Sequence, residues 1–425
     1  MFMCFRASSS ARWLVVPSTD AANGAPQGLT PRRCGVTSTP EMTVPLRVLH
    51  IVHQIHAGGL ERMVELLVRH INPDSFDVEV MCLSQWSEVA DRLSNTAMVL
   101  RGPRQSRAAL IYPRSLARAI AKRDPHVVHC HSGVWYKAAR AARMAGVRWV
   151  VHSEHGRRHP EPFLDPFIDR RAARHTDVIV AVSRPLEAYL RRRIVGPDSA
   201  LVVIPNGVDT DSLTPGPPDR DFFRLLGITQ GAKVIGSAGR LEPVKGYEGM
   251  LRAFKELCSL PGLSEDAPYL VIAGDGSQRP RLESLARQLQ VHSRVRFVGW
   301  KDDLKGFYRS LTIFTLASQS EGTSVGLLEA MSCGVCPVVT DVGGNAGVLG
   351  PDLAHRLVPA GRPAALAAAW RRSLQDDNAR DRDSKVGRAR VKEDFGLARM
   401  VEAYQRLYAM APQCPVTSLA PRESR

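Results

Sequence analysis

The stretch Glu321-Gly-Thr-Ser-Val-Gly-Leu-Leu-Glu329 holds two carboxylates separated by seven residues at the start of a helical run. Thr323 and Ser324 are good N-cap residues, so the small and apolar residues 325–331 predict a helix. Eight positions are a little over two helical turns, which places both carboxylates near one side. The free N–H groups at a helix start favour an anion such as a diphosphate. A capped helix with two solvated glutamates explains these residues equally well.

A second charged segment lies about 80 residues upstream. Lys233-Val-Ile-Gly-Ser-Ala-Gly-Arg240 is an apolar run that ends in small residues, which predicts a buried parallel strand followed by a tight loop. Arg240 and Lys245 lie on that loop, and Gly246 opens the next predicted helix. Arginine offers phosphate oxygens a planar fork, and lysine offers a point charge. Together with the glutamate pair, these two cations indicate a site for an anionic ligand.

The two segments resemble the two signatures of the retaining GT-B glycosyltransferases of family 4. The resemblance runs from about Arg47 to Tyr408. It includes four shorter motifs in the order of the family, which are Gly58-Gly-Leu-Glu-Arg62, Pro205-Asn-Gly-Val-Asp209, Ala273-Gly-Asp-Gly276 and Phe297-Val-Gly299. It implies an α/β fold of two Rossmann-like, doubly wound parallel-sheet domains that face each other across a cleft. The bacterial exopolysaccharide members of the family are especially similar, through 58–62 and 152–156.

The resemblance implies a role for each charged residue of the two signatures. Arg240 and Lys245 would hold the diphosphate of a nucleotide-sugar donor. Glu329 would accept hydrogen bonds from the ribose hydroxyls, and Glu321 would contact the hydroxyls of the donor sugar. All four charged positions are present in this chain, so the resemblance implies an active enzyme.

Backbone groups complete the implied donor site. The N–H groups of Thr323, Ser324 and Val325 would lie near the phosphates. Gly59, at the first turn from strand to helix, would let the backbone approach the donor phosphate closely. An ordinary tight turn also accounts for Gly59.

Two histidines follow predicted strands of the first domain. His155, in Trp149-Val-Val-His-Ser-Glu-His-Gly156, matches the position from which the family reaches the donor sugar or its leaving oxygen. His131 follows Val127-Val-His129 and is expected to line the acceptor side. Either side chain could instead be structural. Neither belongs to a metal-binding pattern, since His152 and His155 lie on one loop without a third ligand, and the catalytic base stays open.

The sequence predicts no metal and no other cofactor apart from a UDP- or GDP-sugar as co-substrate. Metal-dependent transferases hold their cation with Asp-x-Asp, and the nearest match is Asp302-Asp303, which predicts a helix cap instead. Cys333 and Cys336 lack a second cysteine pair, so a zinc site is not expected. The 8 cysteines are scattered without a disulfide framework, which fits a reducing cytoplasm.

Charge and composition restrict the partners. The chain has 425 residues and a net charge of +15, with many arginines in its first half, and its aromatic content is 6%. Few aromatics and no recognised nucleic-acid module argue against nucleic acid as a partner. An anionic membrane surface with a lipid-linked acceptor fits the charge better, although a solvated basic face would look the same. The sequence has no run of 18 apolar residues, so no membrane span is predicted. The expected location is the cytoplasm, with peripheral binding at the inner face of the plasma membrane.

Predicted strands and helices alternate throughout the chain, which is typical of doubly wound α/β sheets. Strands are expected at 47–53, 77–83, 126–129, 148–152, 178–182 and 201–204, and then at 269–273, 295–298, 311–316 and 336–340. Pro215-Gly-Pro-Pro218 marks a linker. The predicted division is a disordered or misassigned extension (1–42), an acceptor-side domain (43–214), a donor-binding domain (215–395), a helix that returns to the first domain (396–412) and a disordered tail (413–425).

The leading hypothesis is a metal-independent, retaining glycosyltransferase that extends a cell-surface or exopolysaccharide glycan on a lipid-linked acceptor. Transfer to a small soluble acceptor is an alternative, and so is a non-catalytic nucleotide-sugar-binding regulator. A nicotinamide dehydrogenase is disfavoured because no Gly-x-Gly-x-x-Gly follows the first strand. Two departures from the family lie near the site. Ala317-Ser318 replaces the usual Pro-Ser, and Gly343-Gly-Asn-Ala-Gly347 lacks the glutamate that often follows the glycine pair.

Overall fold

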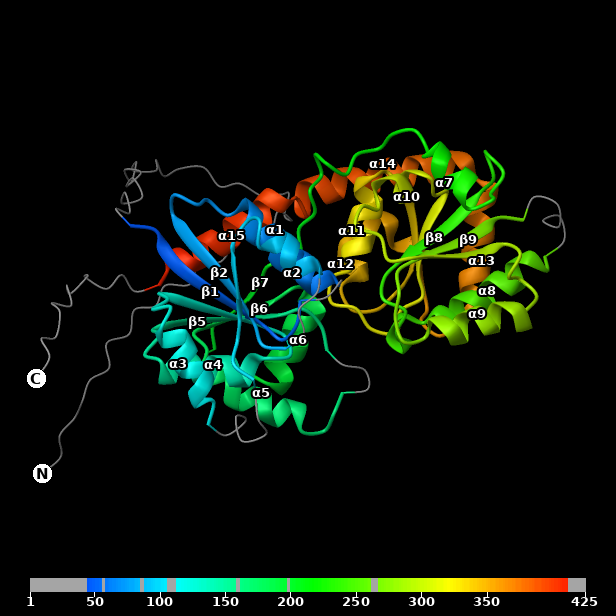
Figure 1. The fold of residues 1–425 in the computed structure, drawn as a ribbon. Coiled ribbons are helices and arrows are strands. Elements are labelled where there is room, and N and C mark those ends of the chain that lie inside the picture. The colour runs from blue at the N-terminus through cyan, green and yellow to red at the C-terminus, as the bar shows by residue number, and fades with distance from the viewer. Residues whose placement is uncertain are drawn as a thin grey trace, which may run out of the picture. The chain divides into compact units, whose positions relative to one another are not determined.

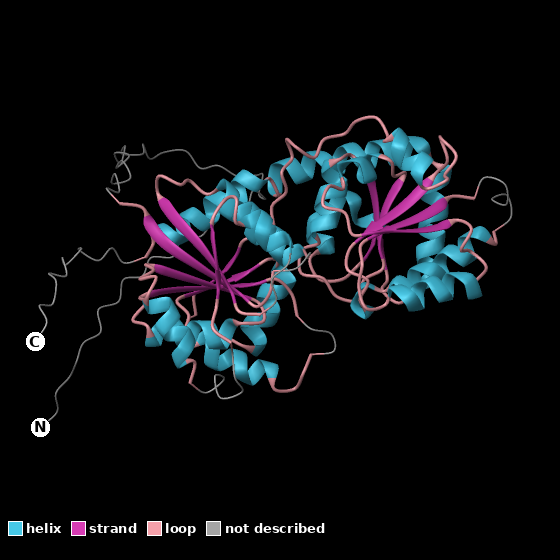
Figure 2. Ribbon diagram, viewed as in Figure 1, coloured by secondary structure: helices cyan, strands magenta, loops and turns pink. Residues whose placement is uncertain are grey.

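The computed structural model describes residues 44–55, 58–84, 88–104, 112–157, 161–196, 199–260 and 267–411. These residues form two parallel sheets, and helices cover both faces of each sheet (Figure 2). The predicted fold class is therefore confirmed. The proposed extension (1–42) and tail (413–425) lie outside the described residues.

The first sheet has seven strands within the described residues, in the order β3-β2-β1-β4-β5-β6-β7. Figure 1 labels β1, β2, β5, β6 and β7 among them. They are β1 (Leu46–Val52), β2 (Phe76–Cys82), β3 (Met98–Arg101), β4 (Val127–His131), β5 (Trp149–Glu154), β6 (Val178–Ala181) and β7 (Leu201–Val203). Strand β1 lies between β2 and β4, with His50 paired in register with His129. Nearly all of β1 and β4 is buried, as expected where helices cover both faces of a parallel sheet.

In the described residues, six helices connect the strands of the first sheet. They are α1 (Gly59–His70), α2 (Glu88–Leu93), α3 (Arg114–Ala121), α4 (Trp135–Met144), α5 (Asp165–Ala173) and α6 (Arg184–Arg193). One apolar core includes residues of α3, α4 and α6 on one side of the sheet. A smaller core on the other side includes Val64 and Val68 of α1 and Leu93 of α2.

The second sheet has six strands in the described part of the chain, in the order β10-β9-β8-β11-β12-β13. They are β8 (Val234–Ala238), β9 (Tyr269–Ala273), β10 (Val295–Gly299), β11 (Ile313–Leu316), β12 (Cys336–Thr340) and β13 (Leu357–Val358). Helices α7 (Arg220–Leu225), α8 (Tyr247–Cys258), α9 (Arg279–Gln288), α10 (Lys305–Arg309), α11 (Val325–Ser332), α12 (Asn345–Leu349), α13 (Pro363–Gln375) and α14 (Asp377–Asp394) accompany them, with two short 3-10 turns, η2 (Pro243–Lys245) and η3 (Pro351–Arg356).

The last described helix, α15 (Leu397–Ala409), packs against β1 and α1 of the first sheet. The Tyr408 hydroxyl lies 2.7 Å from Nδ1 of His129 in β4. The indole N–H of Trp149 in β5 donates to the carbonyl of Leu407 at 3.1 Å. The helix predicted at the end of the chain thus supplies side chains to the interior of the first sheet.

The predicted strands occur within two residues of their expected bounds, and the differences have local causes. The sequence analysis missed β3, an edge strand whose residues are exposed or half-buried and therefore show little apolar pattern. It also missed β13, which has only 2 residues. Among the described residues, no helix combines the length and the apolar content needed to cross a membrane.

Candidate active site

Lys245 and Glu321 form an ion pair between two loops of the second sheet. Lys245 ends η2, which follows β8, and Glu321 lies in the loop between β11 and α11. The Lys245 Nζ is 2.7 Å from Oε1 of Glu321, and the side chains are only 22% and 7% exposed. The Ser318 hydroxyl donates to the same oxygen at 2.7 Å. The cation predicted for the diphosphate and the carboxylate predicted for the sugar therefore lie side by side.

Arg240 is placed differently from Lys245. Its side chain is exposed, and its guanidinium has no hydrogen bond or ion pair within the described part of the chain. The backbone beside it is fixed, since the N–H of Leu241 donates to the carbonyl of Asp275 at 2.9 Å. A fixed backbone and a guanidinium without a partner in the described residues suit the binding of an external anion.

Helix α11 begins as the sequence predicts. Ser324 is its N-cap and accepts from the N–H of Leu327 at 3.4 Å. Thr323 is held by the first sheet, since its hydroxyl donates to the Val182 carbonyl and its own carbonyl accepts from the Asn206 amide at 2.9 Å. These contacts fix the N–H groups at the start of α11, where an anion is favoured.

Gly59, the first residue of α1, approaches the first residue of α11. A Cβ atom at Gly59 would lie 3.4 Å from Cγ2 of Val325. Two helix N-termini therefore meet within ordinary contact distance. The positive ends of both helix dipoles would act on an anion held there.

Glu329 lies farther along α11 and has its own partner. It accepts a hydrogen bond from the Tyr308 hydroxyl at 2.7 Å. Burial raises the pKa of Glu329, while the hydrogen bond from Tyr308 lowers it. Glu329 lines a pocket together with Arg62 of α1 and the Asp302-Asp303 pair. The two signature glutamates therefore have different partners, although they share a helix region.

The Asp302-Asp303 pair is only partly the helix cap that the sequence predicts. The carboxylate of Asp303 accepts from the N–H of Lys305, the first residue of α10, at 2.8 Å. Asp302 instead accepts from the indole N–H of Trp300 at 3.0 Å. The N-cap position belongs to Leu304, because the helix starts one residue later than a cap at Asp303 requires.

Glycines pack tightly around the Glu321-Gly322 loop. A Cβ atom at Gly343 would lie 1.8 Å from the Glu321 carbonyl oxygen, and one at Gly344 would lie 2.2 Å from that of Gly322. A Cβ atom at Gly322 would lie 2.1 Å from the carbonyl oxygen of His155. Only glycine allows these backbones to approach so closely, so the Glu321 loop is held against both the glycine pair and the loop of His155.

His155 follows β5 and has one engaged and one unengaged ring nitrogen. Its Nε2 lies 3.1 Å from Nδ1 of His131. Its Nδ1 is buried without a hydrogen-bond partner in the described residues. Burial lowers the pKa of His155 to about 4, although the Glu154 carboxylate opposes this shift. The imidazole is therefore neutral at neutral pH.

His131, which the sequence predicts to line the acceptor side, is a buried residue at the end of β4. Its side chain is 2% exposed and lies between His50 and His155, with Nε2 at 3.1 Å from Nδ1 of His50. Strand β4 is covered on both faces and His131 is its last residue, so the side chain lies in the interior.

Three buried histidines come close enough to suggest a metal site. Nitrogens of His50, His129 and His131 lie within 4.8 Å of one another. Every one of these nitrogens already has a hydrogen-bond partner: another histidine of the group, His155, Tyr408 or Ser153. A cation would have to break that network, so the arrangement is that of a hydrogen-bonded chain.

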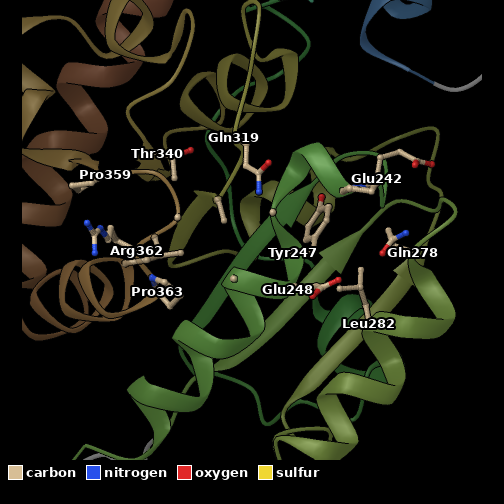
Figure 3. Close-up of a pocket in the computed structure, with 16 residues that line it drawn as sticks. Glu242, Tyr247, Glu248, Gln278, Leu282, Gln319, Thr340, Pro359, Arg362 and Pro363 are labelled. Carbon is tan, nitrogen blue, oxygen red and sulfur yellow. The ribbon is translucent and has the colours of Figure 1, made fainter. Parts of the chain in front are cut away.

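A separate pocket lies beside η2 and α8. Figure 3 shows Arg362 and Pro363 on one side of it and Glu242 and Gln278 on the other. None of the predicted donor-site residues lines this pocket. It is not where the predicted chemistry is located.

The sequence analysis missed several residues that complete the site. Ser318 and Tyr308 hydrogen-bond to the two signature glutamates, and Arg62 lines the pocket of Glu329. Arg62 and Asn206 belong to motifs that carry the resemblance, and that signal could have identified them. Tyr308 lies 21 positions before Glu329, and no local pattern links the two.

Two protein-family models match the chain. The model described as "Glycosyl transferases group 1" matches residues 219–390. The model described as "Glycosyltransferase Family 4" matches residues 57–212. Together they cover most of the chain and include every predicted site residue.

Individual proteins are similar over most of their length. The UDP-Gal:alpha-D-GlcNAc-diphosphoundecaprenol alpha-1,3-galactosyltransferase of Escherichia coli is 25% identical over 378 residues, which are 85% of this chain and 96% of that protein. The D-inositol 3-phosphate glycosyltransferase of Acidothermus cellulolyticus is 28% identical over 411 residues, with 85% and 88% covered. The crystal structure of Anabaena Alr3699/HepE in complex with UDP-glucose shares the fold, with a TM-score of 0.75 at 18% identity, over 86% of this chain and 99% of that chain.

Proposed function

Since the chain belongs to the group 1 and family 4 glycosyltransferases, we propose that it transfers a sugar from a UDP- or GDP-sugar to a lipid-linked glycan, with retention of anomeric configuration and without a metal ion. The observation that carries this proposal is the ion pair of Lys245 with Glu321 just before the start of α11, with the exposed Arg240 on the loop that leads to Lys245. The products would be a nucleoside diphosphate and a glycan longer by one sugar.

The donor diphosphate would take the place next to Lys245. Glu321 compensates the charge of Lys245, so an arriving phosphate would share the Lys245 Nζ with that carboxylate. Arg240 would supply a second cation, and the helix starts at Gly59 and Val325 would supply the positive ends of two dipoles. Each charge-assisted hydrogen bond contributes roughly 1.5–3 kcal/mol. These fixed charges would stabilise the departing diphosphate, the role that a cation has in metal-dependent transferases.

The remaining groups would orient the sugar nucleotide. The Glu329 carboxylate, with one oxygen bound by Tyr308, would accept hydrogen bonds from the ribose diol. Glu321 would contact hydroxyls of the donor sugar, because it is held beside the phosphate position by Ser318 and Lys245. The pocket of Glu329 with Arg62 would surround the nucleoside. The names of the Escherichia coli relative and of the Anabaena complex favour uridine as that nucleoside.

The primary test is nucleotide binding. UDP, GDP and ADP would be titrated by calorimetry into the wild type, Lys245→Ala and the matched control Lys255→Ala, each with and without EDTA. We expect one nucleotide to bind the wild type and the control equally with and without EDTA, and Lys245→Ala to bind at least tenfold more weakly. A loss of binding on adding EDTA would refute the metal-free site. Binding of no nucleotide would refute the donor site itself.

The acceptor class needs a separate assay. The Escherichia coli relative is named for a sugar on diphosphoundecaprenol, which supports a lipid-linked acceptor. The inositol-phosphate relatives support a second candidate, a small soluble acceptor. Radiolabelled donor would be offered with polyprenyl-diphosphate sugars and with inositol phosphate. Transfer only to the soluble acceptor would refute the lipid-linked proposal, and the anomeric configuration of the product would test retention.

A lipid-linked acceptor also requires a membrane-facing surface, and the first sheet carries a suitable one. Phe163, Leu164 and Phe167 are 94%, 62% and 53% exposed, and they line one hollow with Arg170 and Arg193. Clusters of exposed large apolar side chains are unusual in proteins that face only water. Apolar side chains with arginines around them fit the boundary between acyl chains and anionic headgroups. We therefore propose that the enzyme binds the inner face of the plasma membrane through residues 163–167, which lead into α5 and are called the apolar loop below.

Vesicle flotation would test the apolar loop without any substrate. We expect the wild type to float with phosphatidylglycerol vesicles and to remain in solution with neutral phosphatidylcholine vesicles. The double variant Phe163→Ser/Phe167→Ser should bind at least tenfold more weakly. Leu225→Ser is the control, since Leu225 is 73% exposed on α7. Equal binding by the double variant would refute the assignment of this loop, while nucleotide binding should be the same in all variants.

A further inference from the structure

Six buried side chains of the first sheet and α15 form one continuous chain of hydrogen bonds that ends at the half-buried His155, just after β5. From His155, the contacts run to His131 at 3.1 Å, to His50 at 3.1 Å and to the Tyr408 hydroxyl at 3.4 Å. They continue to His129 at 2.7 Å, to the Ser153 hydroxyl at 2.8 Å and to the Tyr404 hydroxyl at 2.9 Å. Among the described residues, His155 and Tyr404 are its two ends.

Every member of the chain can donate one hydrogen bond and accept another along it. Burial lowers the pKa of His50 to about 3 and that of His155 to about 4, and it lowers the pKa values of His129 and His131 well below the usual range. All four imidazoles are therefore neutral at neutral pH, with one N–H and one bare nitrogen each. A hydroxyl likewise has one proton. Once the direction of a single bond is chosen, the direction of all the others follows.

The direction of these hydrogen bonds is determined at Tyr404. Its side chain is buried at 4% exposure, and in the described residues the hydroxyl of Ser153 is its one hydrogen-bond partner. A buried phenol proton without an acceptor costs free energy. The opposite direction would leave this proton unpaired even with a ligand bound, whereas donation from Tyr404 to Ser153 leaves only an N–H at His155, which a ligand can satisfy. We therefore assign the Tyr404 hydroxyl as the donor. The Ser153 hydroxyl must then donate to Nε2 of His129.

The remaining bonds follow in order. Nδ1–H of His129 donates to the oxygen of Tyr408, whose hydroxyl donates to Nε2 of His50. Nδ1–H of His50 donates to Nε2 of His131, and Nδ1–H of His131 donates to Nε2 of His155. The proton of His155 is thereby forced onto Nδ1, the nitrogen that is buried without a partner in the described residues.

We propose that Tyr404 is a positioning residue of α15 which, through this chain, holds His155 with its proton on Nδ1, so that His155 is a hydrogen-bond donor to an oxygen of the bound donor substrate. An unsatisfied buried N–H is costly unless a ligand supplies the acceptor. The sugar nucleotide supplies hydroxyl and phosphate oxygens, and the His155 backbone already touches the loop of Glu321 at Gly322. A neutral imidazole with its free nitrogen protonated cannot accept a proton there, so His155 is not the catalytic base. This role rests on the proposed function, whereas the position of the proton does not.

The position of the proton is measured by ¹⁵N NMR of histidine-labelled protein. Ring nitrogens with and without a proton differ widely in chemical shift, and a His155→Gln sample assigns the signals. We expect wild-type His155 to carry its proton on Nδ1, and Tyr404→Phe to change that shift toward a mixture of tautomers. Tyr136→Phe is the matched control, since the Tyr136 hydroxyl accepts from Arg140 outside this chain, and it should leave the His155 signals unchanged.

Kinetics would separate positioning from folding. Tyr404→Phe should lower kcat at least tenfold and leave the thermal midpoint close to that of the control, and Ser153→Ala, which interrupts the chain one step later, should have the same effect. A wild-type proton on Nε2 would overturn the proposal, and so would an unchanged tautomer in both variants. One equivalent of zinc in the purified protein would also overturn it, because a cation among the histidines would replace the chain. If transfer activity is never found, the NMR result still decides the position of the proton.

Discussion

Gly343 tests whether the tight packing around Glu321 is needed for activity. Its φ is +54°, in the left-handed region, and a Cβ atom there would lie 1.8 Å from the Glu321 carbonyl oxygen and 2.7 Å from the carbonyl carbon. Real Cβ atoms are essentially never found closer than 3.0 Å, so in Gly343→Ala the two loops must separate by about 1 Å. The left-handed backbone adds about 1–2 kcal/mol for a residue with a side chain.

We expect Gly343→Ala to lose much more activity than stability. A displacement of about 1 Å in a catalytic group can reduce the rate about 100-fold. The unfolding free energy should fall by about 1–3 kcal/mol, from strain and overpacking together. Transfer kinetics, calorimetric donor titration and urea unfolding would measure these effects.

Gly347 is the matched control for this substitution, because it belongs to the same segment. A Cβ atom at Gly347 would have no neighbour within 4 Å. Gly347→Ala should therefore retain the wild-type rate and stability. If Gly343→Ala instead turned over and bound donor like the wild type, the inference that close backbone packing holds Glu321 in place would be refuted.

Three further perturbations test the charges and the buried histidines. Tyr308→Phe leaves the buried Glu329 carboxylate without its donor and should reduce the unfolding free energy by about 1.5–3 kcal/mol; an unchanged urea midpoint would contradict this. Arg356 is 6% exposed and binds the Asp383 carboxylate at 2.7 Å. Arg356→Ala should therefore lower the unfolding free energy by about 3–5 kcal/mol in urea unfolding. Arg382→Ala, at an exposed position, should lower it little. The folded pKa of His50 is about 3, below its unfolded value, so as the pH falls below about 6.5 only the unfolded state takes up its proton. As the pH falls from about 6 to 4, His50 and the neighbouring buried histidines should therefore each lower the unfolding free energy by about 1.4 kcal/mol per pH unit. An unfolding free energy that does not change with pH in chemical denaturation would refute this.

Much of the donor site could be predicted because its signals are local. An apolar run followed by Arg240 and Lys245 identifies a strand and its loop within one short segment. Ser324 before an apolar run likewise identifies a helix start. The parallel order of β8 and β11 then brings both loops to the same edge of the sheet. Strand periodicity and capping chemistry depend on neighbours a few residues away, so they can be read without coordinates.

Prediction failed where residues interact across the whole chain. The burial of His131 could not be predicted, because it follows from the central place of β4 in its sheet. No sequence pattern indicated Tyr404, because its hydrogen bond with Ser153 joins residues 251 positions apart. Edge strand β3 was missed because exposed residues carry no apolar pattern.

The sequence by itself determined the alternating elements, the helix starts and the identity of the charged side chains, because spacing along the chain fixes which residues share a strand, a turn or a cap. The tertiary structure alone decided that Lys245 is paired with Glu321, that Glu329 is bound by Tyr308, and that α15 completes a hydrogen-bonded chain to His155. The order of the strands and the burial of the side chains determine those partners. Both arise only when distant segments pack together and every buried donor must find an acceptor.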